Sequence, residues 1–511
     1  MRALAPEFRP YRWAMPTDEV ARLAGIDPSQ VLRFDQNTPA LPLPSTRPGA
    51  IAPALARISG YPAGGYRALR SAIAKYAEVE PENIVLGAGA DDLILLCARA
   101  YAGPGDTIVV PEGPTYPLYR NAAQLAGAQV ATQHADAVLT FACRPNNPTG
   151  ALGPLPEARP LVVDEAYFEY SGETAVPLID DGVIVLRTFS KLFALAGARI
   201  GYAIAGREIA DELNSRQAPA PVSTVSAALA LAALVDPPDA NPVIEERARL
   251  AALLRALGLP PEPSHANFLY VPVDYGIALG DALLRQGIVV RAYPEAIRVS
   301  VLDETDDDAL VSALARVLDR PPPVPASGGR QARVLRATAE TRLSVRLALD
   351  GASRVHVGTG AGLYDHFLEQ LAFHAGFDLT LVGAGDLETG EHHTAEDAAL
   401  AFGQALDEAL GDRRGIARYG DAVVPMDDAL ARAAVDLGGR AHAEVKLEHD
   451  PAMATHMLAS IAQAARTSIH VESAGRDAHH VAEAAFKAVG RALRVAVRSD
   501  GAGLPSTKGL L

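Results

Sequence analysis

The sequence predicts two joined domains, an α/β domain with a largely parallel sheet in residues 1–320 and an α+β domain of two repeated sheet-plus-helices units in residues 331–511. Three observations predict this fold class. Short apolar runs alternate with longer helical patterns in the first part, which is typical of a parallel sheet covered by helices. Prolines and glycines then interrupt the chain. Beyond them, one pattern of residues occurs twice, which indicates an internal repeat.

In the first part, we expect buried strands within residues 82–90, 105–113, 159–166, 182–190 and 198–206, because each holds a short apolar run bounded by turn-forming residues. Helices are expected at residues 68–77 and 92–100, between these runs. The pattern changes near residue 240. We therefore expect a large domain at about residues 40–235, and a small domain formed by the two ends of this part, including about residues 240–320.

The stretch "DRPPPVPASGGRQ", residues 319–331, divides the chain. Its prolines favour a stiff, extended segment, and its Ser-Gly-Gly favours a flexible one. We assign residues 321–330 to a linker. After it, "DHFLEQLAFHAGFDLTL" (365–381) aligns with "THMLASIAQAARTSIHV" (455–471), and each copy is followed by a helix that begins with His-His-x-x-Glu. The repetition predicts two copies of one α+β unit.

Composition limits the classes of function. The chain has 511 residues and 49% hydrophobic residues, which indicates a globular protein of several domains. A net charge of −15 argues against nucleic acid or an anionic membrane as the main partner. The two cysteines, Cys97 and Cys143, have no metal or redox spacing and fit a reducing cytoplasm. The N-terminus lacks a signal pattern, and the apolar stretch at residues 225–235 is too short to span a bilayer.

The duplicated His-His-x-x-Glu pattern predicts a metal site. On a helix, residues three and four apart share a face, so Glu396 reaches towards both His392 and His393. Imidazole and carboxylate groups together suit Mn, Fe or Zn, and paired metals are a known catalytic device. A lone His-His pair is more often surface decoration, but duplication of the whole unit favours metal binding. The candidate ligands are His366, His392, His393, Glu396, His456, His479, His480 and Glu483.

The second part resembles imidazoleglycerol-phosphate dehydratases over residues 333–511. The resemblance is carried by "RATAET" (336–341), "TGAGLYDHF" (359–367), "EHHTAED" (391–397), "LGDRRGIARYG" (410–420), "PMDDA" (425–429), "DLGGR" (436–440), "HHVAEAAFKA" (479–488) and "STKG" (506–509). These motifs together are highly specific. Two departures are mild: Phe367 stands where the family usually has methionine, and Asp477 stands where asparagine is common.

The resemblance implies two Mn²⁺ ions and a set of roles. One ion would be held by His392, His456, His479 and Glu483, and the other by His366, His393, His480 and Glu396, with ligands drawn from neighbouring subunits. Glu340 matches the acid/base glutamate, and Lys487, one helical turn past Glu483, is expected to line the site. Arg418, Arg440, Ser506 and Lys508 match phosphate-binding positions. The family forms trimers that close into a twenty-four-subunit shell.

Lysine is scarce, with five residues against 41 arginines among the 46 basic residues, so each lysine deserves a specific explanation. Lys191 lies in "TFSKLFALAGARIGY" (188–202), directly after an expected strand, and is a Schiff-base candidate because arginine cannot act as this nucleophile. Upstream, Asp164 ends the run "LVVDEAY" and Asn147 lies in "RPNNPTG". The turn "LGAGADD" (86–92) leads into a helix whose N-terminus suits a phosphate.

This order of motifs resembles the fold-type-I pyridoxal-phosphate aminotransferases, and most of all the histidinol-phosphate aminotransferases, over nearly all of residues 1–320. "YPAGGYRALR" (61–70), "PEGPTYPLY" (111–119) and "SHANFLYV" (264–271) add to the match. Pyridoxal 5′-phosphate is the implied cofactor and dimers are the implied assembly. Arg144 leads its loop where the family usually has another residue, so its role is left open.

The resemblance implies the following roles in the cofactor site. Lys191 would bind the cofactor covalently and move the substrate proton, and Asp164 would pair with the pyridinium nitrogen. Asn147 and Tyr167 would bond the phenolic oxygen. Tyr116 would stack on the ring. The phosphate would be held by Ser190, Arg199 and the backbone at Ala90 and Asp91, with Tyr61 reaching the partner subunit's cofactor. Arg298 would bind the α-carboxylate of glutamate, and Arg291 is a candidate for the substrate phosphate.

Together the two resemblances imply a bifunctional histidine-biosynthesis enzyme, in which imidazole-acetol phosphate made by the dehydratase is transaminated with glutamate to histidinol phosphate. Two alternatives stay open at this point. The aminotransferase could act on aromatic or other amino acids, or the second part could be a metal-binding scaffold that gathers aminotransferase dimers and has no activity.

Overall fold

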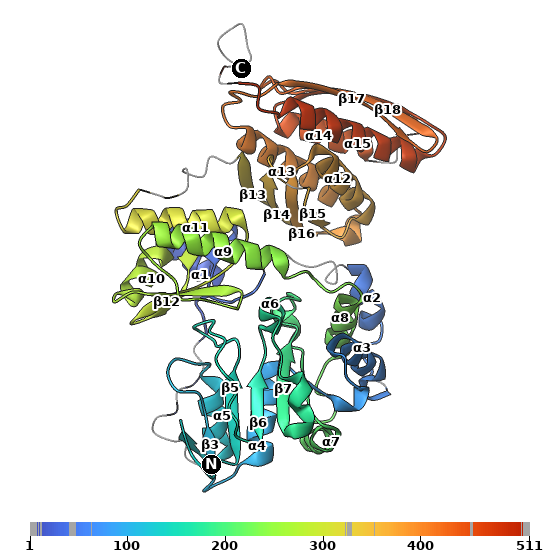
Figure 1. Ribbon diagram of the computed structural model, residues 1–511. Coiled ribbons are helices and arrows are strands. Elements are labelled where there is room, and N and C mark those ends of the chain that lie inside the picture. The colour runs from blue at the N-terminus through green and yellow to red at the C-terminus, as the bar shows by residue number, and fades with distance from the viewer. Residues whose placement is uncertain are drawn as a thin grey trace. The chain divides into compact units, whose positions relative to one another are not determined.

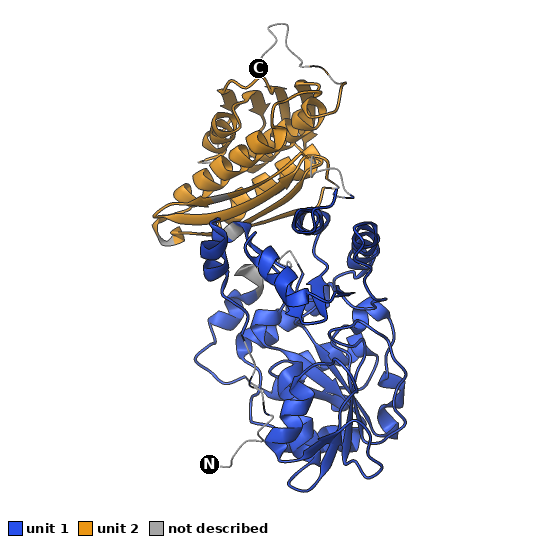
Figure 2. Cartoon of the chain, turned by 90° about the vertical axis from the view of Figure 1, so that its left-hand side faces the viewer, with its two compact units in different colours: residues 1–327 blue, residues 328–511 orange. Residues whose placement is uncertain are grey.

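The computed structural model describes residues 8, 10, 13–39, 48–62, 64–321, 323, 330–351, 353–449, 453–501 and 503. The chain forms two compact units, residues 1–327 and residues 328–511 (Figure 2). Most of the predicted linker, and the predicted site residues Ser506 and Lys508, lie outside the described residues. Within the described chain, none of the helices combines the length and apolar character needed to cross a bilayer.

Unit 1 contains a seven-stranded sheet in the order β2-β8-β7-β6-β5-β3-β4, in which β8 alone runs antiparallel to its neighbours. Figure 1 labels β3, β5, β6 and β7 of this sheet. The prediction of a largely parallel sheet is confirmed. Its strands are β2 (Ile84–Gly87), β3 (Thr107–Val109), β4 (Gln129–Ala131), β5 (Leu139–Cys143), β6 (Leu161–Asp164), β7 (Val183–Thr188) and β8 (Gly201–Ile204). The central strands are continuous apolar runs because both faces of the sheet are covered.

Helices cover this sheet on two sides. Leu161 and Val163 of β6 pack in a core with the helices α3 and α8, whereas Val162 between them packs in a second core with α4 and α5. The helices of this part are α2 (Pro48–Leu55), α3 (Arg67–Ala77), α4 (Ala90–Tyr101), α5 (Leu118–Ala126), α6 (Phe168–Ser171), α7 (Arg207–Arg216) and α8 (Thr224–Val235). The alternation of strand residues between two cores makes a three-layer structure.

A third core joins both ends of unit 1. Leu32 and Phe34 from the N-terminal segment pack with Leu250, Val271 and Leu310, which lie more than 200 positions later in the sequence. The strands here are β1 (Leu32–Arg33), paired with β10 (Ile288–Val289), and a sheet of β9 (Phe268–Pro272), β11 (Arg291–Tyr293) and β12 (Ala296–Ser300). The helices are α1 (Thr17–Ala24), α9 (Asn241–Ala256), α10 (Gly276–Leu284) and α11 (Glu304–Val317).

Unit 2 contains the predicted repeat. Two four-stranded sheets have the orders β13-β14-β16-β15 and β17-β18-β20-β19, so each strand of the first has a counterpart in the second. The first half comprises β13 (Gln331–Ala337), β14 (Thr341–Ala348), β15 (Val355–Gly358), α12 (Gly362–Ala375), β16 (Asp378–Gly385) and α13 (His392–Leu410). The second comprises β17 (Tyr419–Met426), β18 (Ala429–Asp436), β19 (His442–Leu447), α14 (Ala454–Ala464), β20 (Ser468–Ala474) and α15 (Ala478–Ala496).

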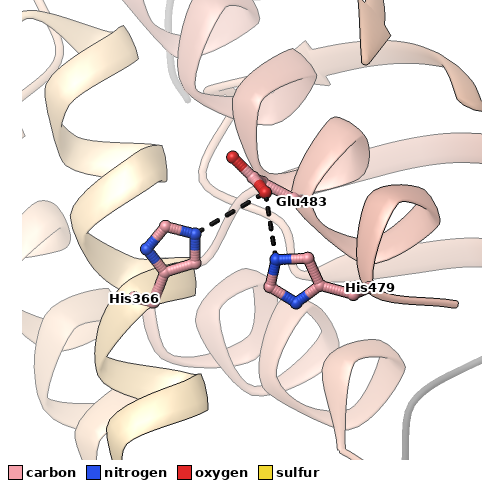
Figure 3. A group of neighbouring side chains, drawn as sticks. All are labelled: His366, His479 and Glu483. Atoms are coloured by element: carbon pink, nitrogen blue, oxygen red, sulfur yellow. Dashed lines mark ion pairs between the residues drawn. The ribbon is translucent and has the colours of Figure 1, made fainter. Parts of the chain in front are cut away.

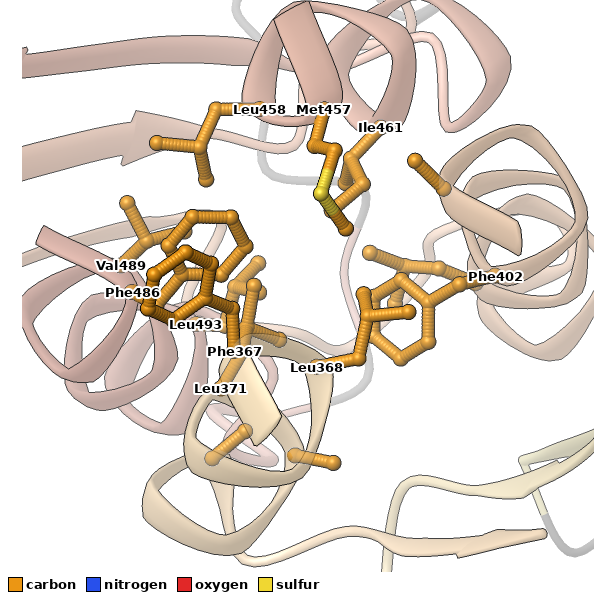
Figure 4. Packing of buried hydrophobic residues seen from close by; sticks show 14 of the residues in the cluster. Phe367, Leu368, Leu371, Phe402, Met457, Leu458, Ile461, Phe486, Val489 and Leu493 are labelled. Carbon is orange, nitrogen blue, oxygen red and sulfur yellow. The ribbon is translucent and has the colours of Figure 1, made fainter. Parts of the chain in front are cut away.

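The helices of the two halves pack on each other in one shared core, where Phe367 and Phe486 stack at 5.1 Å between ring centroids (Figure 4). Helix α12 contacts α15, and α13 contacts α14. Each of these helix–helix contacts depends on a glycine, and the two glycines occupy equivalent positions in the two halves of the repeat. A Cβ at Gly490 would lie 2.4 Å from the carbonyl oxygen of Leu371, and a Cβ at Gly403 would lie 2.8 Å from that of Ile461. This packing brings the four helix N-terminal regions, which carry the histidines, into two clusters.

Candidate active sites

The first candidate site lies at the carboxyl ends of β5, β6 and β7 in unit 1. Asp164 is the last residue of β6, Asn147 follows β5, and Lys191 follows β7. In an open α/β sheet, ligands bind beside the carboxyl ends of the strands, because loops from neighbouring strands converge there. The predicted acid, amide and lysine therefore lie at one edge of the same sheet.

Asp164 is a buried carboxylate with two donors. The Tyr119 hydroxyl donates to Oδ2 at 2.6 Å and the Ala166 amide donates to Oδ1 at 3.1 Å. Burial raises the pKa of Asp164 to about 6, although both hydrogen bonds oppose the rise. Each carboxylate oxygen has a second acceptor position, so Asp164 can accept a further hydrogen bond from a cationic ring nitrogen.

Lys191 has an environment that favours its neutral, nucleophilic form. Burial, together with the positive charge of Arg298, lowers the pKa of Lys191 to about 8. Its Nζ donates to the carbonyl oxygen of Gln36 at 3.3 Å and lies 5.4 Å from the centre of the Tyr167 ring. An amine with this pKa is partly unprotonated near neutral pH, as a nucleophile and proton carrier must be.

Polar groups converge on the Tyr167 hydroxyl. The side-chain amides of Asn37 and Asn147 donate to it at 3.1 and 3.4 Å. Arg298, a buried residue on β12, donates to Asn147 Oδ1 at 2.7 Å and to the carbonyl oxygen of Asp35 at 2.6 Å. Asn147, Tyr167 and Arg298 therefore form one network beside Lys191, and Arg298 also links β12 to the N-terminal segment.

The turn that the sequence predicts to hold a phosphate leads into the N-terminus of α4. Ala90 begins the helix after Gly89, and a Cβ at Gly201 would lie 2.8 Å from the Ala90 amide nitrogen, so that glycine is needed for the close approach of β8. Asp91 pairs with Arg199 at 3.1 Å and accepts from the Tyr116 hydroxyl at 2.9 Å. Nearby on the chain, Thr188 donates to Ser190 Oγ at 2.9 Å.

Three further residues that the sequence singles out have distinct settings. Tyr61 is 93% exposed in the single chain. Arg291 lies directly opposite Arg298 in the β11–β12 pairing, so the two side chains are on the same face of that sheet. Arg144, whose role the sequence leaves open, pairs with Glu173 at 2.6 Å and donates to the carbonyl oxygen of Gly153 at 2.6 Å, so it fastens the loop after β5.

The second candidate site consists of two histidine–glutamate clusters in unit 2. In the first, Glu483 Oε2 lies 3.2 Å from His479 Nε2 and 3.6 Å from His366 Nε2, with the two rings stacked 5.7 Å apart (Figure 3). Burial opposes ionisation of Glu483, but Lys487, whose Nζ lies 2.7 Å away, and His366 outweigh it and lower its pKa. The cluster thus offers two imidazoles and one ionised carboxylate.

The other cluster repeats this arrangement in the other half. Glu396 Oε1 lies 3.2 Å from His456 Nε2, and Oε2 lies 3.7 Å from His392 Nε2. The ligand sets that the resemblance implies combine residues of neighbouring subunits and stay a prediction, whereas within one chain Glu396 lies with His392 and His456, and Glu483 lies with His366 and His479. The physical reason is that each glutamate reaches the histidine one turn earlier on its own helix and one from the helix packed beside it.

His393 and His480 lie apart from these clusters and contact aspartates instead. His393 Nδ1 lies 3.1 Å from Asp386, which raises the pKa of His393, and 3.6 Å from Oε2 of the predicted acid/base residue Glu340. His480 Nδ1 lies 2.6 Å from Asp428 Oδ1. Among the predicted phosphate ligands, Arg418 pairs with Asp436 at 2.7 Å, and Arg440 is exposed.

Sequence reasoning missed four residues of these sites: Tyr119, Asn37, Asp386 and Asp428. Tyr119 and Asp428 both lie in motifs that carry the family resemblances, "PEGPTYPLY" and "PMDDA". A polar residue that lies in such a motif and has no predicted role is a candidate site residue, and this signal points to Tyr119 and Asp428. Asn37 has no such signal, because only the pairing of the N-terminal segment with β12 places it beside Tyr167.

Comparison with known proteins identifies relatives of each unit. The imidazoleglycerol-phosphate dehydratase family model matches residues 359–493, and the aminotransferase class I and II model matches residues 30–314. The imidazoleglycerol-phosphate dehydratase of Acidothermus cellulolyticus is 52% identical over 192 residues, which covers 36% of this chain and 93% of that protein. That of Frankia casuarinae is 51% identical over 193 residues and is covered to 99%.

A solved structure resembles unit 1. The histidinol-phosphate aminotransferase from Sinorhizobium meliloti, in complex with pyridoxal-5′-phosphate, aligns with a TM-score of 0.54 and 28% sequence identity. The alignment covers 62% of this chain and 98% of that chain.

Proposed function

Because the chain belongs to the class I and II aminotransferases and to the imidazoleglycerol-phosphate dehydratases, we propose that it is a bifunctional enzyme of histidine biosynthesis. Unit 2 dehydrates imidazoleglycerol phosphate to imidazole-acetol phosphate, and unit 1 transaminates that product with glutamate to give histidinol phosphate. One observation carries the proposal: a lysine–aspartate pair at a sheet edge and a duplicated histidine–glutamate cluster occur in one chain, and the product of one reaction is the substrate of the other.

The residues of unit 1 fit pyridoxal phosphate. Asp164 is buried, keeps acceptor positions available and has a pKa of about 6, as a partner for a pyridinium nitrogen requires. Asn147 and Tyr167 would hold the phenolic oxygen. The N-terminus of α4, with Ser190 and Arg199, would hold the phosphate. When bound, the cofactor withdraws electrons from the substrate Cα and so makes its proton removable.

The protein's own groups then move that proton. Lys191 Nζ takes the proton from Cα of the amino acid and returns it when the oxo acid is the substrate. Arg298 clamps the α-carboxylate of glutamate, since its guanidinium is buried beside Asn147 and Lys191. Arg291, on the same face of the small sheet, is the proposed ligand of the substrate phosphate.

The residues of unit 2 fit divalent Mn, Fe or Zn. Each cluster combines two imidazole nitrogens with a carboxylate, which is the donor set that these metals prefer. When bound, two metals of this kind would supply charge stabilisation to the imidazole ring of the substrate. Glu340 moves the proton at C2 of the glycerol chain, because its carboxylate lies 3.6 Å from His393 Nδ1 and is exposed to incoming substrate. Arg418, Arg440, Ser506 and Lys508 would bind the phosphate.

The arrangement of the candidate metal ligands within one chain also supports assembly into oligomers. Each cluster provides three ligands from one chain, whereas His393 and His480 lie apart from both. Ligands shared between neighbouring subunits would complete the metal sites. We propose dehydratase trimers, closing into a twenty-four-subunit shell, together with aminotransferase dimers. Mass photometry of the full chain with Mn²⁺ tests this, and a monomer under those conditions would contradict it.

A coupled assay tests the function. Purified protein receives imidazoleglycerol phosphate, glutamate, pyridoxal phosphate and Mn²⁺, and the formation of 2-oxoglutarate and histidinol phosphate is followed. Both products should appear, a chelator should stop them, and added imidazole-acetol phosphate should restore them. If imidazole-acetol phosphate accumulates and is not aminated, unit 1 acts on another amino acid. If metal is bound without any turnover, unit 2 is a scaffold.

A further inference from the structure

His393 and His480 share an environment that the other candidate metal ligands lack. Each is the second histidine of its His-His pair, and each presents its Nδ1 to an aspartate. The distance is 3.1 Å from His393 Nδ1 to Asp386 Oδ2 and 2.6 Å from His480 Nδ1 to Asp428 Oδ1. Because an ionised carboxylate only accepts hydrogen bonds, each Nδ1 must carry a proton to make this contact.

Protonation at Nδ1 decides what the other ring nitrogen can do. In a neutral imidazole with a proton on Nδ1, Nε2 keeps its lone pair and can bind a metal. A carboxylate behind the ring also fixes the ring's orientation and increases its basicity. The nearest acid to His480 Nε2 is Asp427, at 3.6 Å, which is beyond hydrogen-bonding distance.

Both aspartates are themselves held in place. Asp428 Oδ2 accepts from the backbone amides of Arg476 at 2.6 Å and Asp477 at 3.0 Å, so it ties the β17–β18 turn to the start of α15. Asp386 Oδ2 accepts from the Thr389 hydroxyl at 2.9 Å. These contacts orient both carboxylates, and such support is what a preorganised site needs.

The two halves of the repeat reach this arrangement by different routes. In the second half, the hairpin turn between β17 and β18 supplies Asp428. In the first half, the corresponding turn between β13 and β14 supplies Glu340, and Asp386 from the segment between β16 and α13 holds the histidine instead. Asp386 thereby leaves the Glu340 carboxylate, 3.6 Å from His393 Nδ1, available for proton transfer.

We propose that Asp386 and Asp428 are positioning residues that hold His393 and His480 in the tautomer with a free Nε2, and so set the affinity of unit 2 for divalent metal. This inference rests on the proposed function, because it concerns the metal that the function requires. Removal of such a carboxylate weakens metal binding by roughly 10- to 100-fold in other metal sites, and the same range is expected here.

The test is Mn²⁺ binding to the full-length, metal-free chain, measured by the electron paramagnetic resonance signal of free Mn²⁺. Asp386→Asn and Asp428→Asn should each weaken binding by about 10-fold or more. Asp421→Asn, which removes an exposed carboxylate on β17, serves as the matched control and should bind as the wild type does. Variants that bind Mn²⁺ with wild-type affinity would overturn the inference while leaving the proposed function intact.

A double-substitution cycle separates positioning from a general structural role. If Asp386 acts through His393, Asp386→Asn should cause no further loss of affinity once His393→Ala is present. A loss of the same size in both backgrounds would overturn the proposal. Asp386→Asn also covers the case in which Asp428→Asn fails to fold, because Asp428 bonds two backbone amides. Wild-type protein that binds no Mn²⁺ would instead refute the metal-dependent function itself.

Discussion

The hydrogen bond from Tyr119 to Asp164 gives the most specific prediction for unit 1. Tyr119→Phe removes the hydroxyl and leaves the ring, which is fully buried and stacks on Phe141 at 5.1 Å, in place. The substitution should raise the pKa of Asp164, because it removes a donor that stabilises the ionised carboxylate.

The size of the effect follows from the burial of both partners. A hydrogen bond to a charged group contributes about 1.5–3 kcal/mol, which corresponds to roughly 1–2 pKa units. The pKa of Asp164, about 6 in the wild type, should therefore rise to between about 7 and 8. At pH 7 the wild-type carboxylate is mostly ionised, whereas half or more of the variant's would be neutral.

The assay is the pH dependence of pyridoxal-phosphate binding. Both proteins carry Lys191→Ala, so that the ionisation of Lys191, with a pKa of about 8, does not contribute. Equilibrium dialysis between pH 5.5 and pH 8.5 should give a midpoint about 1–2 units higher in the variant than in the protein that keeps Tyr119. Tyr275→Phe, the same change at an exposed site, should leave the midpoint unchanged. An unshifted midpoint in Tyr119→Phe would refute the reasoning.

Four further predictions follow from the two units. Lys191→Ala should abolish transamination and leave dehydration at the wild-type rate, measured separately with each substrate; loss of both would mean that the sites are not independent. Glu340→Gln should lower the dehydration rate at least 100-fold, as loss of a general acid/base does, while bound Mn²⁺ stays stoichiometric. Gly490→Ala should lower the free energy of unfolding by more than about 1 kcal/mol, since its Cβ would clash with the Leu371 carbonyl oxygen, and Gly362→Ala, where the Cβ meets open space, is the control. Finally, because the pKa of Asp164 is raised from 3.8 to about 6 on folding, its contribution to stability is present below pH 4 and is lost as pH rises through 6. In cofactor-free protein, Asp164→Asn should therefore increase the free energy of unfolding by up to about 3 kcal/mol more above pH 6 than it does at pH 4. Urea unfolding of both proteins at the two pH values measures this difference.

The sequence was most informative where chemistry is local. A strand followed within a few residues by Lys191, or a helix that begins with His479 and His480, needs only the neighbouring residues to be recognised, because backbone geometry over one turn fixes their relative places. The repeat was equally visible, since each half must bury the same apolar face against the other. The two sheets of identical strand order confirm it.

The tertiary structure determines which of the candidate site residues lie close to one another. The sequence offers eight metal-ligand candidates but not their neighbours within one chain. The packing of α13 on α14 and of α12 on α15, permitted by Gly403 and Gly490, places each glutamate beside one histidine of its own helix and one of the adjacent helix. Contacts such as Tyr119 with Asp164 likewise join residues 45 positions apart. Sequence therefore determined which chemical groups are present, and the long-range packing of helices and strands determined their pairing, because distance in space depends on the whole core.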